Sequence, residues 1–371
     1  MGALIDPSSL VLDQAPPMRP IGDAAARRGE PRGWDFLGAV PVPLRHRIRD
    51  GVGDLATRIA AEGGPALKCC FPMGQGGRGP IGRLRFVRAL EDYPDMLVSD
   101  GQGDSFNRRF LEAHVAGGAF TGSQPERVAS VFIDCGLIDP KGWIGVYAVA
   151  PFVFLIDHQK LDGLPAPRRW ADLADPAYRG QVIFGGWRRG GEGRWSEVNK
   201  FVLLNMAREF GLDGLARILR NVPTLLHSAQ MPRLAGADAS PGGIYILPWS
   251  LADICPRRAH TKVVWPEDGA LAYPLWLTTK VARRARLDAL IRHFHGAELG
   301  RYLGQNRYPA LCPDLAPALP EGARLKWLGW DFLRHRSTAQ LIKAATRMFH
   351  ESQDRFEAQD RPRVLEDRSC V

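Results

Sequence analysis

Residues 145–184 read GVYAVAPFVFLIDHQKLDGLPAPRRWADLADPAYRGQVIF. An apolar run from Val146 to Ile156 comes first, a proline-rich turn and an acidic, aromatic segment follow, and a short apolar run ends at Phe184. Short apolar runs bounded by turn residues are typical of buried strands. We therefore predict that the first run is a strand leaving one lobe and that the second run is the first strand of another lobe.

A second stretch with the same character lies about a hundred residues further on. Residues 261–280 read TKVVWPEDGALAYPLWLTTK, two β-rich runs separated by a turn at Pro266–Gly269. We interpret this stretch as the return crossing between the lobes. The two crossings together predict an α/β fold, a two-lobed clamp with a hinge of two crossing strands.

The lobes follow from these crossings. A chain of 371 residues usually divides into more than one compact unit. The predicted division is a disordered N-terminal arm (1–34), a discontinuous lobe I (35–148 and 267–351), lobe II (149–266) and a polar C-terminal tail (352–371).

Two strand–loop–helix units precede the first crossing. Residues 66–71 (ALKCCF) are predicted to form a short buried strand that leads into a glycine-rich loop and a helix predicted over 82–93. Residues 96–99 lead into Asp100-Gly101-Gln102-Gly103 and a second helix that ends at Val115. Successive units of this kind indicate a parallel sheet, with binding sites at the carboxyl ends of its strands.

The composition and net charge of the chain indicate which kinds of binding partner to expect. Hydrophobic residues make up 45% and charged residues 24% of the chain, as in ordinary globular proteins, and the formal net charge is +9. The basic residues are scattered in short groups without a nucleic-acid-binding motif, so no nucleic acid partner is predicted. A basic surface can attract an anionic ligand, although it also serves solubility.

The N-terminal segment and the hydropathy of the chain bear on location. Asp6, Pro7 and Asp13 interrupt the first residues early, and no basic region followed by an apolar core is present, as a secretory signal requires. No run approaches the ~18 apolar residues that a membrane span needs. We expect no membrane span, a monomer and a cytoplasmic location, with a periplasmic location as the alternative if the true start lies upstream.

The loops at the predicted strand ends supply the candidate ligand-binding residues. Each loop has a structural reading beside the functional one: a tight turn, a helix cap, or a buried core tryptophan. In the first lobe the candidates are Met73, Gly74 and Gln75, then Ser99, Asp100, Gln102 and Ser105, and finally Tyr147. In the second lobe they are Gly186, Trp187, Trp195 and Trp249.

Catalytic and metal-binding patterns are a separate question. No nucleophile, zinc-protease or Cys/His pattern has the required context, so neither catalytic residues nor a cofactor are predicted. The six cysteines include no C-x-x-C pair, and buried free thiols explain the adjacent Cys69 and Cys70 best. Whether a metal is bound stays open, because Cys69-Cys70 or Asp100 could take part in such a site.

The segment 167–180 carries a resemblance to a known family. It follows the pattern P-x-x-W-x-D-L-x-D-P-x-Y-x-G, directly after one predicted strand and before another. This pattern and the second crossing resemble solute-binding proteins of ABC transporters, the type 2 periplasmic-binding-protein fold, in the branch of family 1 and ferric-iron-binding proteins. The resemblance covers roughly residues 67–349.

This resemblance implies a function. The chain would capture a small polar ligand, an anion or a metal chelate, in an interlobe cleft by hinge closure, for an ABC permease. Iron-binding members of the branch use a neighbouring pair of tyrosines, and the seven tyrosines here contain no such pair. The alternatives are a cytoplasmic ligand sensor, a metal-handling protein, or an enzyme on the same fold.

Overall fold

The computed structural model describes residues 33–72, 80–101, 106–188 and 195–360. Within these ranges the chain divides into two compact units. Unit 1 holds residues 33–98, 106–119 and 279–287, and unit 2 holds 99–101, 120–278 and 288–360, each within the described ranges. The predicted lobe limits at residues 148 and 267 stay a prediction.

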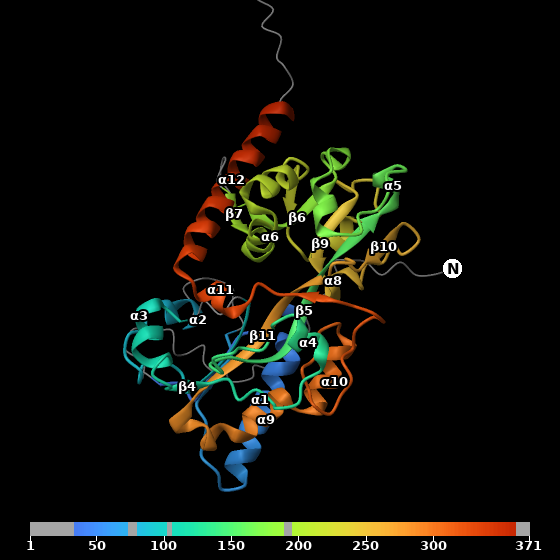
Figure 1. Ribbon diagram of the computed structural model, residues 1–371. Coiled ribbons are helices and arrows are strands. Elements are labelled where there is room, and N and C mark those ends of the chain that lie inside the picture. The colour runs from blue at the N-terminus through green and yellow to red at the C-terminus, as the bar shows by residue number, and fades with distance from the viewer. Residues whose placement is uncertain (1–32, 73–79, 102–105, 189–194, 361–371) are drawn as a thin grey trace, which may run out of the picture. The chain divides into compact units, whose positions relative to one another are not determined.

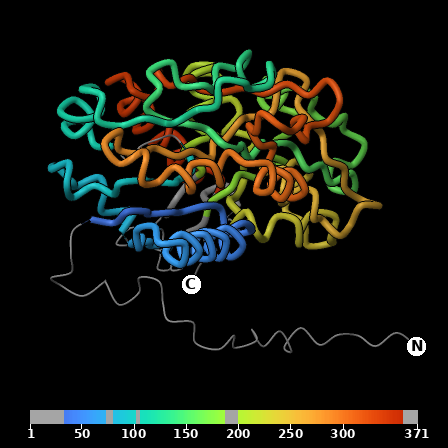
Figure 2. The backbone as a smooth tube through the Cα atoms, turned by 90° about the horizontal axis from the view of Figure 1, so that it is seen from below, coloured from blue at the N-terminus to red at the C-terminus, as the bar shows by residue number. Residues whose placement is uncertain are grey.

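Within the described residues, unit 1 holds three parallel strands and several helices. Its strands are β1 (Phe36–Gly38), β2 (Cys69–Cys70) and the first part of β3 (Met96–Asp100), and β1 lies between the other two. The long helix is α1 (Arg45–Ala61), the blue coil of Figure 2, which buries Ile48 and Val52. The shorter ones are α2 (Pro80–Arg83), α3 (Arg108–Phe110) and a π-helical turn, Leu111–Val115.

The helix predicted over residues 82–93 is wrong. Helical backbone ends at Phe86, and Val87 is extended. Among residues 80–86 only Leu84 is buried, whereas Phe86 is 64% exposed. Without a continuous apolar face, a helix of three turns gains too little from packing to form.

Unit 2 contains most strands of the twelve-stranded sheet and most of the helices (Figure 1). Its strands are β4 (Phe120–Thr121), β5 (Gly145–Asp157), β6 (Val182–Arg188), β7 (Trp195–Val198), β8 (Thr224–Leu226), β9 (Ile244–Pro248), β10 (Thr261–Val264), most of β11 (Ala270–Lys280) and β12 (Leu325–Lys326). Its helices are α4 (Ser130–Asp134), α5 (His158–Leu161), α6 (Lys200–Leu219), α7 (Met231–Leu234), α8 (Trp249–Ala252), α9 (Asp288–His295), α10 (Ala297–Gln305), α11 (Trp330–Arg334) and α12 (Arg336–Asp360).

The centre of this sheet is β5, the strand predicted from the opening stretch. All thirteen of its residues are buried, as expected for a strand without polar alternation. It pairs antiparallel with β9, β10 and β11. Gly145 must be a glycine, because an added Cβ would lie 1.9 Å from the carbonyl oxygen of Gly122.

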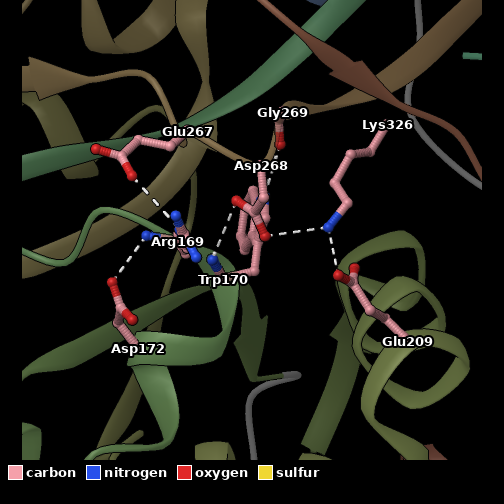
Figure 3. Close-up of polar contacts among 8 residues, drawn as sticks. All are labelled: Arg169, Trp170, Asp172, Glu209, Glu267, Asp268, Gly269 and Lys326. Carbon is pink, nitrogen blue, oxygen red and sulfur yellow. Dashed lines mark hydrogen bonds and ion pairs between the residues drawn. The ribbon is translucent and has the colours of Figure 1, made fainter. Parts of the chain in front are cut away.

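The second predicted crossing also forms two strands, β10 and β11, separated by the turn at Pro266–Gly269. The family pattern holds this turn in place (Figure 3). The Trp170 indole N–H donates to the Gly269 carbonyl at 2.8 Å, and the Trp170 backbone N–H donates to Asp268 at 3.4 Å. Asp268 in turn accepts from Lys326, which also pairs with Glu209 of α6.

The C-terminal helix α12 is longer than predicted. It continues to Asp360, so the first part of the predicted tail is helical. The cause is packing against the end of α6 and the residues that follow it. Ser352 donates to the Leu219 carbonyl at 2.9 Å, and the buried Gln353 donates to the Val222 carbonyl.

Candidate functional site

A carboxylate and a phenol meet at the end of β3. Asp100 is the last residue of this strand, and the Tyr273 hydroxyl of β11 donates to its Oδ1 at 3.4 Å. The Gly101 N–H donates to the Pro274 carbonyl at 2.8 Å, which fixes the chain at this point. We call Asp100, Gly101 and Tyr273 the Asp100 corner. Asp100 and Tyr273 are both partly exposed.

The position of Gly101 excludes a side chain. Its φ of +85° lies in the left-handed region, and an added Cβ would lie 2.6 Å from the Tyr273 hydroxyl. We expect Gly101→Ala to lower the free energy of unfolding by about 1–3 kcal/mol, measured by urea denaturation. Gly118→Ala has the same φ of +85° but meets nothing within 4 Å, so it isolates the backbone cost. Equal losses for both variants would contradict the close contact with Tyr273.

Two buried tyrosines lie within the electrostatic reach of Asp100. Tyr147 of β5 is 1% exposed, and its hydroxyl has no hydrogen-bond partner in the part of the chain that the structure describes. The Tyr308 hydroxyl accepts from Ser250 of α8 at 3.1 Å. We call Tyr147 and Tyr308 the buried tyrosines. Ser250 and Tyr308 are buried as well.

The pKa values of the buried tyrosines are raised. Burial is the largest cause for Tyr147, whose pKa lies well above its usual value, and the charge of Asp100 and the Tyr308 hydroxyl add to it. Burial raises the pKa of Tyr308 to about 12, the Ser250 hydrogen bond opposes this, and Asp100 contributes again. Both phenols therefore stay protonated at neutral pH and offer hydroxyl groups.

Aromatic rings surround Tyr273. Its ring lies edge-on to Phe201 at a centroid distance of 5.1 Å and is tilted against Phe152 at 6.1 Å. Phe201 also stacks on Trp327 at 6.3 Å. Because these three rings are buried, they hold the Tyr273 side chain in one orientation.

A histidine with a lowered pKa, next in sequence to Phe294, predicts that the stability of the fold depends on pH. Tyr147 packs against Phe294, and the next residue, His295, has its pKa lowered from 6.5 to about 4 by burial, against the opposing effect of the Gly122 carbonyl. Between these values the unfolded chain binds a proton that the folded chain does not. Stability therefore falls as the pH is lowered from about 6.5 to about 4, by on the order of 3 kcal/mol in total.

This expectation is checked by urea denaturation at several pH values. The slope of the unfolding free energy between pH 6.5 and 4 should be smaller in His295→Gln than in the wild type. The exposed His46 supplies the control, since His46→Gln should leave the slope as it is. A slope that is the same in all three proteins would contradict a neutral, buried His295.

The other predicted ligand residues lie in several different elements or outside the described residues. Ser99 is buried within β3, next to Asp100. Trp249 begins α8 and is 8% exposed, with Trp265 edge-on at 5.4 Å and the Arg307 guanidinium over its ring at 5.0 Å. The remainder are in the β6–β7 hairpin (Gly186, Trp187 and Trp195) or outside the described residues (Met73, Gly74, Gln75, Gln102 and Ser105). Their roles in ligand binding stay predictions.

Two residues near Asp100 were missed by sequence reasoning. Tyr273 lies within the stretch predicted as the second crossing, but nothing in its neighbourhood indicates that its hydroxyl reaches Asp100, 173 residues away. Tyr308 follows α10 and has no motif around it. A search for tyrosines inside the crossing strands would have found Tyr273 and Tyr147 but not Tyr308.

The described residues contain no cluster of the side chains that usually bind metal ions in proteins. No group of three or more His, Cys, Asp or Glu side chains that could hold a metal occurs among them. Cys69 is a free thiol in β2, and burial, with Asp35 and Cys70 adding to it, raises its pKa to about 12. Because thiolates bind soft metals and thiols do not, Cys69-Cys70 is a poor candidate for one.

The sequence model of the bacterial extracellular solute-binding protein family matches residues 91–336. This is more than half of the chain, and the chain belongs to that family. Family members are binding proteins that take up a small ligand, in partnership with an ABC permease. No curated protein is significantly similar to the chain in sequence.

Solved structures of periplasmic binding proteins share the fold. A ferric binding protein from Bordetella is 15% identical with a TM-score of 0.57, and 86% of this chain aligns with 99% of that one. The Trichodesmium protein IdiA (FutA), in complex with iron and citrate, is 14% identical with a TM-score of 0.56, over 85% and 99% of the chains. The Campylobacter jejuni ferric binding protein is 9% identical with a TM-score of 0.56, over 87% and 99%.

The structural likenesses confirm the predicted α/β fold of the periplasmic binding proteins. The family match confirms the predicted solute-binding class. At 9–15% identity they concern the fold alone. Among the helices that the structure describes, none has the length and apolar character of a membrane span.

Proposed function

We propose that this solute-binding protein captures a small polar solute at the Asp100 corner and delivers it to an ABC-type permease. The observation that carries the proposal is the meeting of Asp100 and Tyr273, two polar side chains from distant strands that remain partly exposed within an otherwise buried setting. Buried surroundings strengthen the electrostatic interactions of a bound polar group. Capture by closure of two lobes stays a prediction.

The proposed ligand classes are an anion or a metal chelate. The ferric binding proteins among the similar structures, and the one in complex with iron and citrate, support the chelate. A ferric site made by two adjacent tyrosines is not part of the proposal, because no two of the seven tyrosines are adjacent in sequence.

The proposed place of action is outside the cytoplasm. The family is described as extracellular, which favours the periplasmic alternative over the cytoplasmic location expected from the N-terminal residues. We also propose that the solute leaves unchanged, without turnover. The cytoplasmic sensor and the enzyme are less favoured by family membership.

The test is to identify the solute and then to remove the carboxylate. Native mass spectrometry of the protein from its own host should show a co-purifying small molecule, and calorimetry then gives its affinity. Asp100→Asn should weaken binding at least about tenfold, since the donor group of the solute that lies against the carboxylate loses a charge-assisted hydrogen bond. The matched control is Asp314→Asn, a carboxylate whose side chain is 66% exposed.

Three results would count against the proposal. The first is a protein that carries nothing and is stabilised by no anion, chelate or other small polar compound. The second is a bound solute whose affinity falls equally in Asp100→Asn and Asp314→Asn. The third is chemical conversion of the solute by the purified protein.

A further inference from the structure

We propose that the Asp100 corner binds an organic ammonium group of the solute, with the aromatic rings around Tyr273 forming its apolar surroundings. This inference rests on the proposed function, in which the corner is part of the solute site. It goes further by stating the charge and chemistry of the group that lies against Asp100.

The charge at the Asp100 corner is negative. The Asp100 carboxylate is the acceptor at the corner, and it receives a hydrogen bond from the neutral Tyr273 hydroxyl. Burial is the main cause of the raised pKa values of Tyr147 and Tyr308, and the charge of Asp100 adds to both. Next to this carboxylate an anionic part of the solute is repelled and a cationic part is attracted, so the group that lies against Asp100 is cationic whatever charge the rest of the solute carries.

Aromatic rings lie beside the Asp100 carboxylate. The rings of Phe152, Phe201 and Tyr273 lie within about 5–6 Å of one another, and Trp327 extends the group. Aromatic rings attract organic cations through their negative faces, and the attraction is larger where water is excluded. A carboxylate next to such rings suits an alkylammonium or quaternary ammonium group, which has both charge and apolar surface.

The Tyr147 hydroxyl could form a hydrogen bond to a bound group. The Tyr147 hydroxyl is buried and has no partner within the described residues, and an unpaired buried hydroxyl costs free energy. A bound group with N–H or O–H donors can pair with it.

The described side chains suit an ammonium group better than a bare metal ion. A bare metal ion needs several anionic or soft ligands, and the described residues lack a cluster of three acidic, histidine or cysteine side chains that could supply them. An ammonium group requires neither deprotonation nor a set of charged ligands.

The experiment uses pairs of compounds that match in shape but differ in charge. Choline is compared with 3,3-dimethylbutan-1-ol, and ethanolamine with ethylene glycol, by thermal shift and calorimetry on the full chain. Ferric citrate, phosphate and sulfate are the metal and anion probes. The ammonium member of a pair should raise Tm and its neutral partner should not, and the affinity should fall with ionic strength.

Three variants then test where the ammonium group binds. Asp100→Asn should weaken ammonium binding at least about tenfold, because it removes the charge and keeps the shape. Tyr273→Phe keeps the ring and loses the hydroxyl, so a smaller loss of about threefold is expected. The control Asp314→Asn should bind as the wild type does. A loss in Asp100→Asn that is matched by Asp314→Asn would overturn the inference.

Other outcomes distinguish this inference from the proposed function. Binding of ferric citrate, phosphate or sulfate without any response to the ammonium compounds would overturn the inference and leave the solute-binding proposal in place. Ammonium binding that is indifferent to Asp100→Asn would also overturn it. If no probe binds and no small molecule co-purifies, the proposed function fails together with the inference.

Discussion

Replacement of Arg334 by methionine is expected to lower the free energy of unfolding by about 3–5 kcal/mol. The Asp139 side chain, fully buried, accepts two hydrogen bonds from Arg334 at 2.6 Å each. The Arg334 guanidinium also lies over the rings of Trp143 and Trp330, at 4.6 and 5.6 Å. Methionine fills much of the same space but leaves the Asp139 carboxylate buried without its partner. Urea denaturation followed by tryptophan fluorescence measures the loss.

The Asp139 carboxylate, which pairs with Arg334, also organises the backbone around it. Its carboxylate also accepts from the N–H groups of Lys141, Trp143 and Ile144, each at 3.0 Å. These bonds hold the turn that leads into β5, so the ion pair connects α11 to the start of the central strand. We expect Arg334→Lys to cost less than Arg334→Met, since it keeps the charge and one of the two hydrogen bonds.

The matched control is the exposed ion pair of Arg108 and Glu112, whose side chains are 52% and 57% exposed. Arg108→Met should change the free energy of unfolding by less than about 0.5 kcal/mol, because solvent screens such a pair. If Arg334→Met and Arg108→Met have the same small effect, the ion pair of Asp139 does not stabilise the fold.

The central strands could be predicted because their signal is local. Residues 146–156 are a continuous apolar run and residues 270–277 are rich in apolar and aromatic side chains, and the strands that contain them are buried along nearly their whole length. The pattern in residues 167–180 then pointed to the family that the comparisons confirm. In both cases neighbouring residues carry the whole signal.

The Asp100 corner could be predicted only in part, because its partners are distant in sequence. Asp100 follows a predicted strand and was recognised by position. Tyr273 is 173 residues away, and it becomes a partner only because β11 brings Pro274 against Gly101. The ion pair of Asp139 and Arg334 spans 195 residues, and no local pattern indicates it. Periodicity reports which face of an element is buried, but not which element covers it.

The family pattern has a physical reason in the contacts of Trp170. Its side chain is fully buried, with its ring edge-on to Phe154 of β5 at 4.7 Å. Its indole N–H and backbone N–H both bind the turn before β11 (Figure 3). Asp172 accepts from the backbone N–H groups of Arg168 and Arg169 at 2.8 Å each and so shapes the turn on which Trp170 sits. The pattern therefore links the segment after β5 to the start of β11.

Trp170→Ala should lower the free energy of unfolding by about 3–5 kcal/mol, because it opens a large cavity and removes the hydrogen bond to Gly269. Trp170→Phe separates the two contributions: it keeps most of the packing but leaves the Gly269 carbonyl without its donor, at about 1–3 kcal/mol. Glu267→Gln is the control on the same turn, since its ion pairs with Arg168 and Arg169 are exposed and should contribute less than about 1 kcal/mol. Urea denaturation of the three variants gives the order Trp170→Ala, Trp170→Phe, Glu267→Gln. If Trp170→Ala is no more destabilising than Glu267→Gln, Trp170 does not hold the second crossing, and the pattern needs another physical explanation.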